Sequence, residues 1–459
     1  MNELVFDGNF KYNPFIPYDP TVNPLLTGYV SHPCYGGVQP FVYTDWRDEM
    51  LSWHDNCFIH AGLNPAYIVI FRGADCLKFF NKYFTNGFDN FPVGQIKHGV
   101  MVNEDGYIMQ DGLLYRTGEN EFYTFWLGSY IVYCAEKSGY DLEWQDVTGE
   151  MFMFQLSGPR ALEIVEAATG EDFHGLPYLK HRESRIKGMN VRVLRLGMSG
   201  SLAYEVHGKF EDSIPVYNAL LEAGKDYGIR RLGRHAYWNT HTEGGFPQWL
   251  IHFPYAWETD PAFMEWMEER HALTSAFAAS KQLISGSMGP DLKPRFVHPF
   301  ELGWGQAVNF GHDFVGKDAL AAISGGPHRE TVTLDWNIDD VMEIYRSEFE
   351  PGEPFAVMEG PEDYLQYGQH EFRADQVLAG DKFAGVSAGR IISWHYRKML
   401  SLARIDPGCS KIGTEVFVLW GDPGTRQKKI RATVCRYPYN NECRNDCADL
   451  NQIPSGIKE

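Results

Sequence analysis

The chain has 459 residues, of which 44% are hydrophobic and 22% are charged. This composition is typical of a globular protein of roughly two to four domains, and it excludes general disorder. The 41 Lys and Arg residues against 60 Asp and Glu residues give a net charge of −19. So acidic a chain is expected to repel nucleic acid and anionic lipid, because binding to either depends on cationic contacts with phosphate.

The distribution of apolar residues and cysteines indicates a cytoplasmic protein. No stretch reaches the roughly 18 apolar residues that span a bilayer, and the acidic start of the chain is unlike a signal peptide. The eight Cys residues have neither the spacing of a disulfide framework nor that of a metal site. We therefore expect free thiols, no bound metal, and neither membrane nor nucleic acid as a partner.

The predicted elements begin after an arm rich in Pro and Tyr, which we expect to wrap the folded body. Helices are predicted at 46–53, from 161 to 170, and at 210–227. Strands are predicted where β-branched and aromatic residues gather, with a hairpin turn at 116–120. The strand ranges are 66–71, 99–109, 112–115, 121–126, 151–156, 189–196, 203–207, 331–336, 385–386, 401–405 and 414–420.

This order of strands and helices predicts an α+β fold with antiparallel sheets and an all-β C-terminal module. The expected divisions are an N-terminal arm at 1–45, two folate-binding α+β domains with an interleaved core at 46–150 and 151–255, a connector that begins a third domain at 256–330, and a C-terminal β domain at 331–459. The folate assignment depends on the resemblance described next.

Four local patterns occur in a fixed order along the chain. They are 154–161 (FQLSGPRA), 197–206 (GMSGSLAYEV), 237–246 (YWNTHTEGGF) and 313–320 (DFVGKDAL). Together they resemble the aminomethyltransferase superfamily, to which the glycine-cleavage T-protein belongs. The resemblance extends over about residues 45–425 and implies a disc of three domains, with a C-terminal β-barrel and with tetrahydrofolate in a central channel.

Within that superfamily the chain is most similar to tetrahydrofolate-dependent aromatic O-demethylases, which act on vanillate, syringate and related methoxybenzoates. The segments that carry this similarity are 28–30 (GYV), 297–305 (VHPFELGWG), 331–337 (TVTLDWN) and 418–421 (VLWG). The resemblance implies that a methyl group moves from a methoxy-aromatic compound to N5 of tetrahydrofolate. The products would be a phenol and 5-methyltetrahydrofolate.

Such a reaction requires a group that stabilises the departing phenolate, and a Tyr or a His can donate the hydrogen bond. Tyr237 matches a Tyr that lies at the methyl-transfer centre of the resembled enzymes. His60 precedes the turn at 61–65, which in those enzymes carries substrate residues, so it is the second candidate catalytic residue. A buried side chain with a structural role is the alternative for each.

The resemblance also implies residues that contact the aromatic substrate. Tyr29 and His32 lie in the arm, which in the resembled enzymes closes over the substrate, and His32 is a further candidate donor. Phe125 and Trp126 are expected to form an aromatic wall of the pocket.

Two residues are expected to bind the folate. Glu205 follows the Gly-rich turn, and a carboxylate can accept two hydrogen bonds from the aminopyrimidine edge of a pterin. Phe246 takes the position of an aromatic residue that stacks near the folate in the resembled enzymes. A solvated strand Glu and a core Phe are the alternatives.

The sequence departs from the family pattern in two places. Residues 110–111 read Gln-Asp where the aminomethyltransferases carry adjacent Asp residues, which weakens the case for aminomethyl transfer. The strand at 122–129 lacks the Arg with which O-demethylases hold a substrate carboxylate. Either Arg116 or a His takes over that role, or the substrate ring is larger or less polar.

Two other functions on the same scaffold remain open. A demethylase for an S-methyl sulfonium or an N-methyl amine would need cation–π walls rather than a proton donor for the sulfonium. A folate-binding protein without catalytic activity is the second possibility, because a fold does not establish an activity. In each case we expect a monomer or a homodimer.

Overall fold

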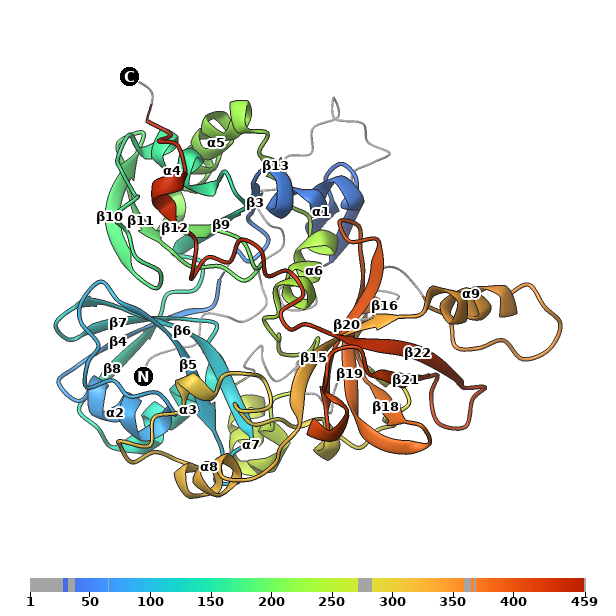
Figure 1. The fold of residues 1–459 in the computed structure, drawn as a ribbon. Helices are drawn as coiled ribbons and strands as arrows, with labels where there is room; N and C mark the ends of the chain where they lie inside the picture. Colours follow the sequence, from blue (N-terminus) through green and yellow to red (C-terminus); the bar gives the residue numbers. More distant parts are fainter. Residues whose placement is uncertain are drawn as a thin grey trace.

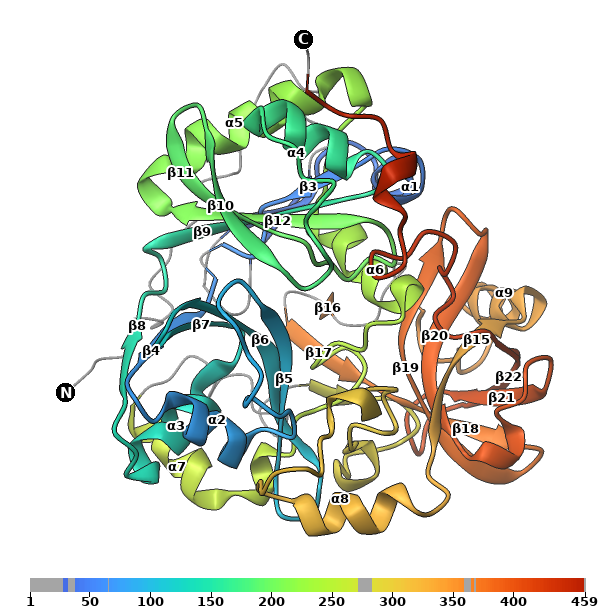
Figure 2. The same ribbon diagram turned by 60° about the vertical axis from the view of Figure 1, so that its left-hand side comes forward.

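The structure is a computed structural model, and it describes residues 28–31, 38–64, 66–270, 283–358, 365–366 and 369–457. Within these residues the chain forms three units that lie around a common centre (Figure 1). Two units are built on open sheets and the third is a barrel. Figure 2 shows the two open sheets one above the other, with the barrel beside them and helix α6 between.

The first unit is built on a six-stranded sheet with the order β10-β11-β12-β9-β3-β13, antiparallel except for the β13–β3 pair. Helices α4 and α5 cover one face through an apolar cluster that includes Phe154 and Leu220. The opposite face is turned toward the second unit. The bounds are α1 Trp46–Asp55, β3 Phe58–His60, β9 Met151–Ser157, α4 Ala161–Thr169, β10 His181–Ile186, β11 Met189–Leu194, β12 Ala203–Lys209, α5 Ser213–Gly224, β13 Arg230–Arg231 and α6 Arg234–Gly244.

The second unit is an antiparallel sheet with the order β5-β6-β7-β4-β8. A cluster rich in Phe fills the space between this sheet and helices α2 and α3, and α7 and α8 from the 256–330 stretch join the same cluster. The bounds are β4 Ile68–Arg72, α2 Cys76–Tyr83, β5 Ile96–Val102, β6 Ile108–Gly118, β7 Glu121–Phe125, α3 Gly128–Ser138, β8 Glu143–Asp146, α7 Pro261–Glu269 and α8 Lys317–Ser324.

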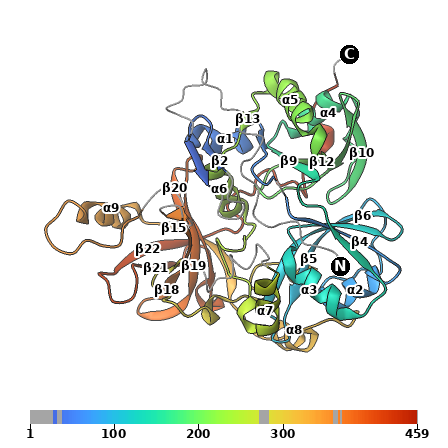
Figure 3. The same cartoon turned by 180° about the vertical axis from the view of Figure 1, so that it is seen from behind.

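The third unit is a closed barrel with the order β15-β20-β19-β18-β21-β22, which β15 closes by pairing with β22. The expected α+β fold with a C-terminal barrel is confirmed. The bounds are β15 Glu330–Trp336, α9 Ile338–Ser347, β18 Asp375–Ala379, β19 Lys382–Ser393, β20 Lys398–Ile405, β21 Glu415–Trp420 and β22 Lys428–Cys435. Short strands outside the three main sheets are β1 Gly28–Ser31, β2 Val38–Val42, β14 Leu283–Ser285, β16 Leu365–Gln366 and β17 Gln369–Arg373. Figure 3 shows β2 beside α1 and α6.

Two local predictions were wrong. The range 99–109 is not one strand, because Asn103 accepts the backbone N–H groups of Asp105 and Tyr107 and turns the chain between β5 and β6. The C-terminal module is not all β, since α9 begins after Asn337, whose side chain accepts the N–H of Asp340. An Asn at this position satisfies a free N–H of the first helical turn.

The division into ranges predicted from the sequence stays a prediction. The strand pairing nevertheless links distant segments, because β3 from the 46–150 range pairs with β9 from the 151–255 range. The end of the chain also returns to the first unit, where the turn Leu450–Gln452 lies against the α4–α5 cluster.

Candidate active site

Three polar side chains form one row across the six-stranded sheet. The register pairs Gln155 of β9 with His60 of β3 on one side and with Glu205 of β12 on the other. Directly paired residues project from the same face of a sheet. All three are buried, and Gln155 Nε2 donates to Glu205 Oε1 over 2.9 Å. Strand register therefore brings together two residues that the sequence proposed separately.

Helix α6 places Tyr237 over this row. Its ring stacks on the His60 imidazole, with centroids 3.9 Å apart and planes inclined by 3°, and its hydroxyl hydrogen-bonds with the side chain of Gln155. Burial and, to a smaller extent, the negative charge of Glu205 raise the pKa of Tyr237 well above its usual value. The phenol is therefore protonated at any ordinary pH and can donate a hydrogen bond.

His60 has the opposite character. Burial lowers its pKa to about 4, although a hydrogen bond with the carbonyl oxygen of Leu232 opposes this effect. Nδ1 lies 2.9 Å from that oxygen, so Nδ1 carries the proton and Nε2 is left as an acceptor. At neutral pH, His60 can accept a proton, and Tyr237 can donate one.

The far end of the row reaches the second unit through His207. His207 follows Glu205 on the same face of β12, and its Nε2 lies 2.8 Å from Glu205 Oε2. The ring of Phe125, from β7, packs on His207 with centroids 4.6 Å apart. Trp126 is the next residue, has a left-handed backbone with φ of 59°, and packs partly buried against the core of the second unit. Phe125 thus contacts the row of polar side chains through His207.

A chain of rings joins Tyr237 to Phe246. His241 lies one turn after Tyr237 on α6, edge-on to its ring with centroids 5.4 Å apart, and its own ring is 6.3 Å from Phe246. Phe246 in turn packs against His98 of β5 and against Trp304, at 5.3 and 5.7 Å between centroids. All three units therefore contribute to or border one centre.

Asp111 is held rigidly at the edge of this centre. One carboxylate oxygen lies 2.8 Å from His98 Nε2, and the other accepts the Tyr255 hydroxyl over 2.7 Å. The second position of the Gln-Asp pair at 110–111 thus carries an ordered carboxylate two contacts away from Phe246.

Several buried polar atoms around this centre have no partner among the described residues. They are the side-chain oxygens of Gln110 and Gln155, the hydroxyl of Tyr115, Nδ1 of His207 and Nε2 of His241. Buried polar groups are nearly always hydrogen-bonded, so such a group of orphans points to a polar ligand. A reduced pterin has amino and ring N–H donors beside a carbonyl acceptor, which matches these amide oxygens and the carboxylate of Glu205. The residues present fit a folate, and Glu205 with Gln155 would hold its pterin.

Two sequence motifs meet behind this site. A side chain on Gly200 would clash with the carbonyl of Asn440 and the Cα of Gly244, and one on Gly244 would lie 2.3 Å from the carbonyl oxygen of Met198. Gly200 also has a φ of +75°, which favours glycine. The Gly-rich turn and the end of α6 can therefore pack backbone to backbone, which fixes Glu205 and Tyr237 relative to each other.

The remaining predicted residues lie elsewhere or are differently used. Tyr29 lies in β1, where it pairs with Pro40, and His32 lies outside the described residues. Arg116 donates to the backbone carbonyl groups of Phe91, Gly118 and Glu119. The expectation that Arg116 replaces the missing substrate-binding Arg was therefore wrong, because its guanidinium already fixes the β6–β7 turn.

Gln155, His207 and His241 are residues that the sequence reasoning missed. His207 could have been found, since alternate residues of a strand share a face and Glu205 was already chosen. His241 could have been found in the same way, because residues four apart on a helix lie together, but no helix was predicted there. Gln155 gave no such signal, because only the register of β9 pairs it with Glu205.

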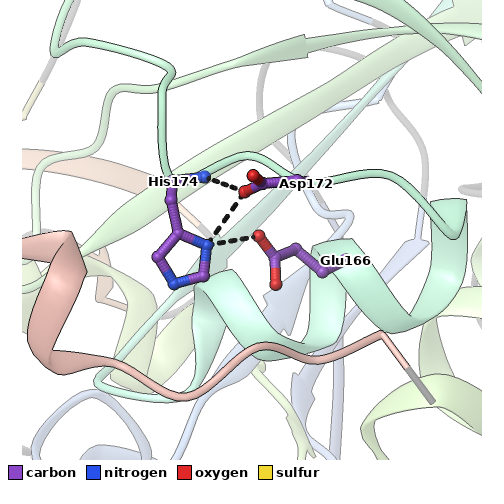
Figure 4. Close-up of side chains that lie close together, drawn as sticks. All are labelled: Glu166, Asp172 and His174. Carbon is purple, nitrogen blue, oxygen red and sulfur yellow. Dashed lines mark hydrogen bonds and ion pairs between the residues drawn. The ribbon is translucent and has the colours of Figure 1, made fainter. Parts of the chain in front are cut away.

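A second group of side chains could by its geometry hold a metal ion, namely Glu166, Asp172 and His174 (Figure 4). His174 Nδ1 faces the two carboxylates at 2.8 and 3.0 Å, and its Nε2 lies 3.0 Å from the carbonyl oxygen of Ile453. Because both ring nitrogens face acceptors, both carry protons and neither has a lone pair for a metal. The buried Glu166 also accepts the N–H of Gly456 over 2.9 Å. The group therefore fastens the C-terminal segment to α4, and the expected lack of a metal stays a prediction.

Within the described ranges, no helix is both long and apolar enough to cross a bilayer.

Comparison with known proteins agrees with this architecture. Residues 61–266 match the family model of the GCVT N-terminal domain. The crystal structure of the glycine cleavage system aminomethyltransferase T from Bartonella henselae superposes with a TM-score of 0.65 over 94% of this chain and 98% of that chain, at 15% identity. At that identity the likeness concerns the fold.

Two curated proteins are more similar in sequence. The sesamin methylene transferase of Sinomonas sp. (strain No.22) is 42% identical over 91% of this chain and 94% of its own length. The syringate O-demethylase of Sphingobium sp. (strain NBRC 103272 / SYK-6) is 32% identical over 90% of this chain and 92% of its own length.

The fold and the site together define a tetrahydrofolate-dependent enzyme of one-carbon transfer in the aminomethyltransferase superfamily. Within that superfamily the chain belongs to the family of the sesamin methylene transferase and the syringate O-demethylase.

Proposed function

We propose that this protein cleaves an aryl ether and transfers the one-carbon group to tetrahydrofolate. The main reaction is O-demethylation of a methoxy-aromatic compound, with a phenol and 5-methyltetrahydrofolate as products. The observation that carries the proposal is the buried, protonated hydroxyl of Tyr237, stacked on a neutral His60 beside Glu205. The 32% identity with the syringate O-demethylase supports the same reaction.

Tetrahydrofolate supplies N5 as the nucleophile for the methyl carbon. The C–O bond breaks, an N–C bond forms, and the net reaction moves one proton from N5 to the phenolate oxygen. Tyr237 donates a hydrogen bond to that oxygen as its negative charge develops, which is the usual role of a general acid. Glu205 and Gln155 orient the pterin, and His60 holds the phenol ring of Tyr237 in place. Much of the rate comes from keeping the reacting atoms in line.

A second candidate moves a methylene group rather than a methyl group. The 42% identity with the sesamin methylene transferase favours it. A methylene bridge between two aryl oxygens would give a catechol and 5,10-methylenetetrahydrofolate, with two C–O bonds broken and two N–C bonds formed. Both candidates need a donor for a departing phenolate, so the same Tyr237 serves either reaction.

The experiment that separates these reactions is an assay of the folate product. Purified protein and tetrahydrofolate are incubated with a methoxybenzoate, a methylenedioxybenzene, a dimethylsulfonium compound and an N-methyl amine. We expect 5-methyltetrahydrofolate from the methoxy compound, or 5,10-methylenetetrahydrofolate from the methylenedioxy compound. Turnover of the sulfonium or the amine alone would contradict the proposal, as would folate binding without turnover of any donor.

We further infer a cytoplasmic enzyme that takes part in the breakdown of lignin-derived aromatics, as a monomer or a homodimer. The thiols support the location, because each cysteine of the described ranges is free and free thiols suit a reducing compartment. These cysteines are Cys57, Cys76, Cys134, Cys409, Cys435, Cys443 and Cys447. Fractionation of the native host and light scattering of the pure protein test the two statements.

A further inference from the structure

Arg404 of β20 is a buried charge that the folded chain leaves unpaired. The residue is 1% exposed, and none of its three guanidinium nitrogens has a hydrogen-bond partner in the part of the chain that the structure describes. An ionised group without a partner is costly to bury, and removal of one member of a buried pair is strongly destabilising for the same reason. Such a group in a folded protein calls for a ligand.

The side chain points out of the barrel toward the centre of the molecule. Its neighbours on β20, Ala403 and Ile405, belong to the core of the barrel, so Arg404 projects from the outer face. The opposite residue on β15 is Thr331, whose hydroxyl donates to the carbonyl oxygen of Glu301 in the second unit. Figures 1 and 2 both show β20 beside α6.

The charges around Arg404 do not neutralise it. Arg329 and Arg295 repel it and Glu301 attracts it, and together with burial they lower the pKa of Arg404 to about 9. Glu301 is already engaged, since one oxygen accepts from Arg329 Nε and the other accepts the backbone N–H of His298. The junction therefore has an excess of positive charge.

This junction adjoins the proposed folate site. Tyr437 and His252 both feel the charge of Arg404. The Tyr437 hydroxyl donates over 2.8 Å to the carbonyl oxygen of Gly245, the residue before Phe246, and His252 Nε2 lies 3.0 Å from the hydroxyl of Thr242 on α6. Arg404 thus lies behind the end of α6 that carries the second predicted folate residue.

We propose that Arg404 is the counter-charge for a carboxylate of a small molecule bound at this centre. The carboxylate is supplied either by the glutamate of tetrahydrofolate or by an aromatic donor that bears an acid group. In both cases a guanidinium offers the planar pair of donors that a carboxylate prefers. The inference rests on the proposed function insofar as both molecules bind at the same centre.

The test is calorimetric binding to the wild type and to Arg404→Met. Four probes are used, namely tetrahydrofolate, 6-methyltetrahydropterin, which has no carboxylate, and the pair 4-methoxybenzoate and 4-methoxybenzyl alcohol. Loss of a charged hydrogen bond corresponds to roughly a tenfold to hundredfold weaker Kd. If the folate glutamate is the partner, tetrahydrofolate weakens by this factor and the pterin does not. If the donor is the partner, only the benzoate weakens.

Stability provides a second readout, because a ligand-free charge should be dispensable for folding. We expect Arg404→Met to keep or raise the Tm of the ligand-free protein, since an apolar side chain replaces an unpaired charge. The matched control is Arg295→Met. Arg295 is equally buried but donates to the carbonyl oxygens of Phe372, Ser285 and Gly289, so its loss should lower the Tm and leave the four Kd values unchanged.

Equal Kd values for the wild type and Arg404→Met with all four probes would overturn the inference. So would a large drop in the Tm of the ligand-free protein, which would indicate a structural role. Neither result depends on turnover, so a failure of the proposed reaction would be seen separately in the product assay.

Discussion

Tyr237 and His60 divide the proton chemistry because burial acts on the two side chains in opposite directions. Burial disfavours the charged form of each group, so it raises the pKa of the phenol and lowers that of the imidazole to about 4. The phenol stays a donor and the imidazole stays an acceptor. Of the candidate donors that the sequence left open, the two that the structure describes are thereby ordered, with Tyr237 first.

We predict that Tyr237→Phe lowers kcat much more than it changes KM. The change removes the hydroxyl and leaves the ring stacked on His60, so binding should survive. The hydrogen bond grows as the C–O bond breaks, so its loss falls on the transition state and lowers the rate by roughly 10²–10⁴-fold. A more acidic phenol should need less help, which rate constants for two ring-substituted donors would reveal.

The matched control is Tyr204→Phe. Tyr204 is a neighbour of Glu205 on β12, but it projects into the α4–α5 cluster, and its buried hydroxyl has no partner among the described residues. Its kinetics should equal those of the wild type. A near-normal kcat for Tyr237→Phe on every donor would make Tyr237 a wall residue only.

We predict that Glu205→Gln weakens tetrahydrofolate binding by about 1.5–3 kcal/mol, the range for a hydrogen bond to a charged group. The variant keeps the shape but replaces an acceptor with a donor beside Gln155 Nε2, which already donates to this position. Isothermal titration measures the change. Glu163→Gln, a buried Glu of α4 paired with Arg160, should bind tetrahydrofolate normally. An unchanged affinity of Glu205→Gln would remove Glu205 from the site.

At the scale of elements, the C-terminal segment is held by a protonated side chain. The carbonyl of Ile453, followed by the charges of Glu166 and Asp172, raises the pKa of His174. A group whose pKa is raised by folding stabilises the fold fully below its unfolded value of about 6.5 and loses that effect as pH rises through its folded pKa. The attachment to α4 is therefore strongest in mild acid.

We predict that His174→Gln lowers the hydrogen-exchange protection of the Gly456 amide, which donates to Glu166. The loss should be about 1 kcal/mol at pH 6, because a hydrogen bond to a charged group is replaced by a neutral one. The loss should shrink as pH rises past the folded pKa, where the wild type also loses its charge. Protection factors measured by mass spectrometry at pH 6 and at pH 8.5 test this, and an equal loss at both pH values would contradict it.

At the scale of the molecule, one ligand site joins the three units. The row of polar residues comes from the first unit, the packing partners of Phe246 from the second, and Arg404 from the barrel. Ligand bound at such a junction stabilises every unit that contributes to it. This arrangement favours a single unfolding transition for the liganded protein.

We predict that tetrahydrofolate at one hundred times its Kd stabilises the whole molecule by about 2.7 kcal/mol. With an unfolding entropy of about 2.1 cal/mol/K per residue, the Tm should rise by roughly 3 °C in one transition. Differential scanning calorimetry measures it, and Glu205→Gln at the same ligand concentration should show a smaller rise. Two transitions of which only one moves would mean that the ligand contacts one unit alone.

The local patterns of the chain were sufficient for the family, the antiparallel sheets and the barrel. They also selected Tyr237, His60, Glu205 and Phe246, which the structure links around one centre through Gln155 and His241. Alternation in strands and glycine at close approaches are properties of adjacent residues, so a sequence can express them directly.

Only the tertiary structure decided how those residues work. Strand register paired Gln155 with both His60 and Glu205, and burial then set which side chain donates and which accepts. The engagement of Arg116 by backbone carbonyl groups and the isolation of Arg404 likewise depend on residues far away in the chain. The sequence by itself determined which chemical groups are present, but hydrogen bonding and desolvation arise from neighbours brought together in space, and these gave the groups their roles.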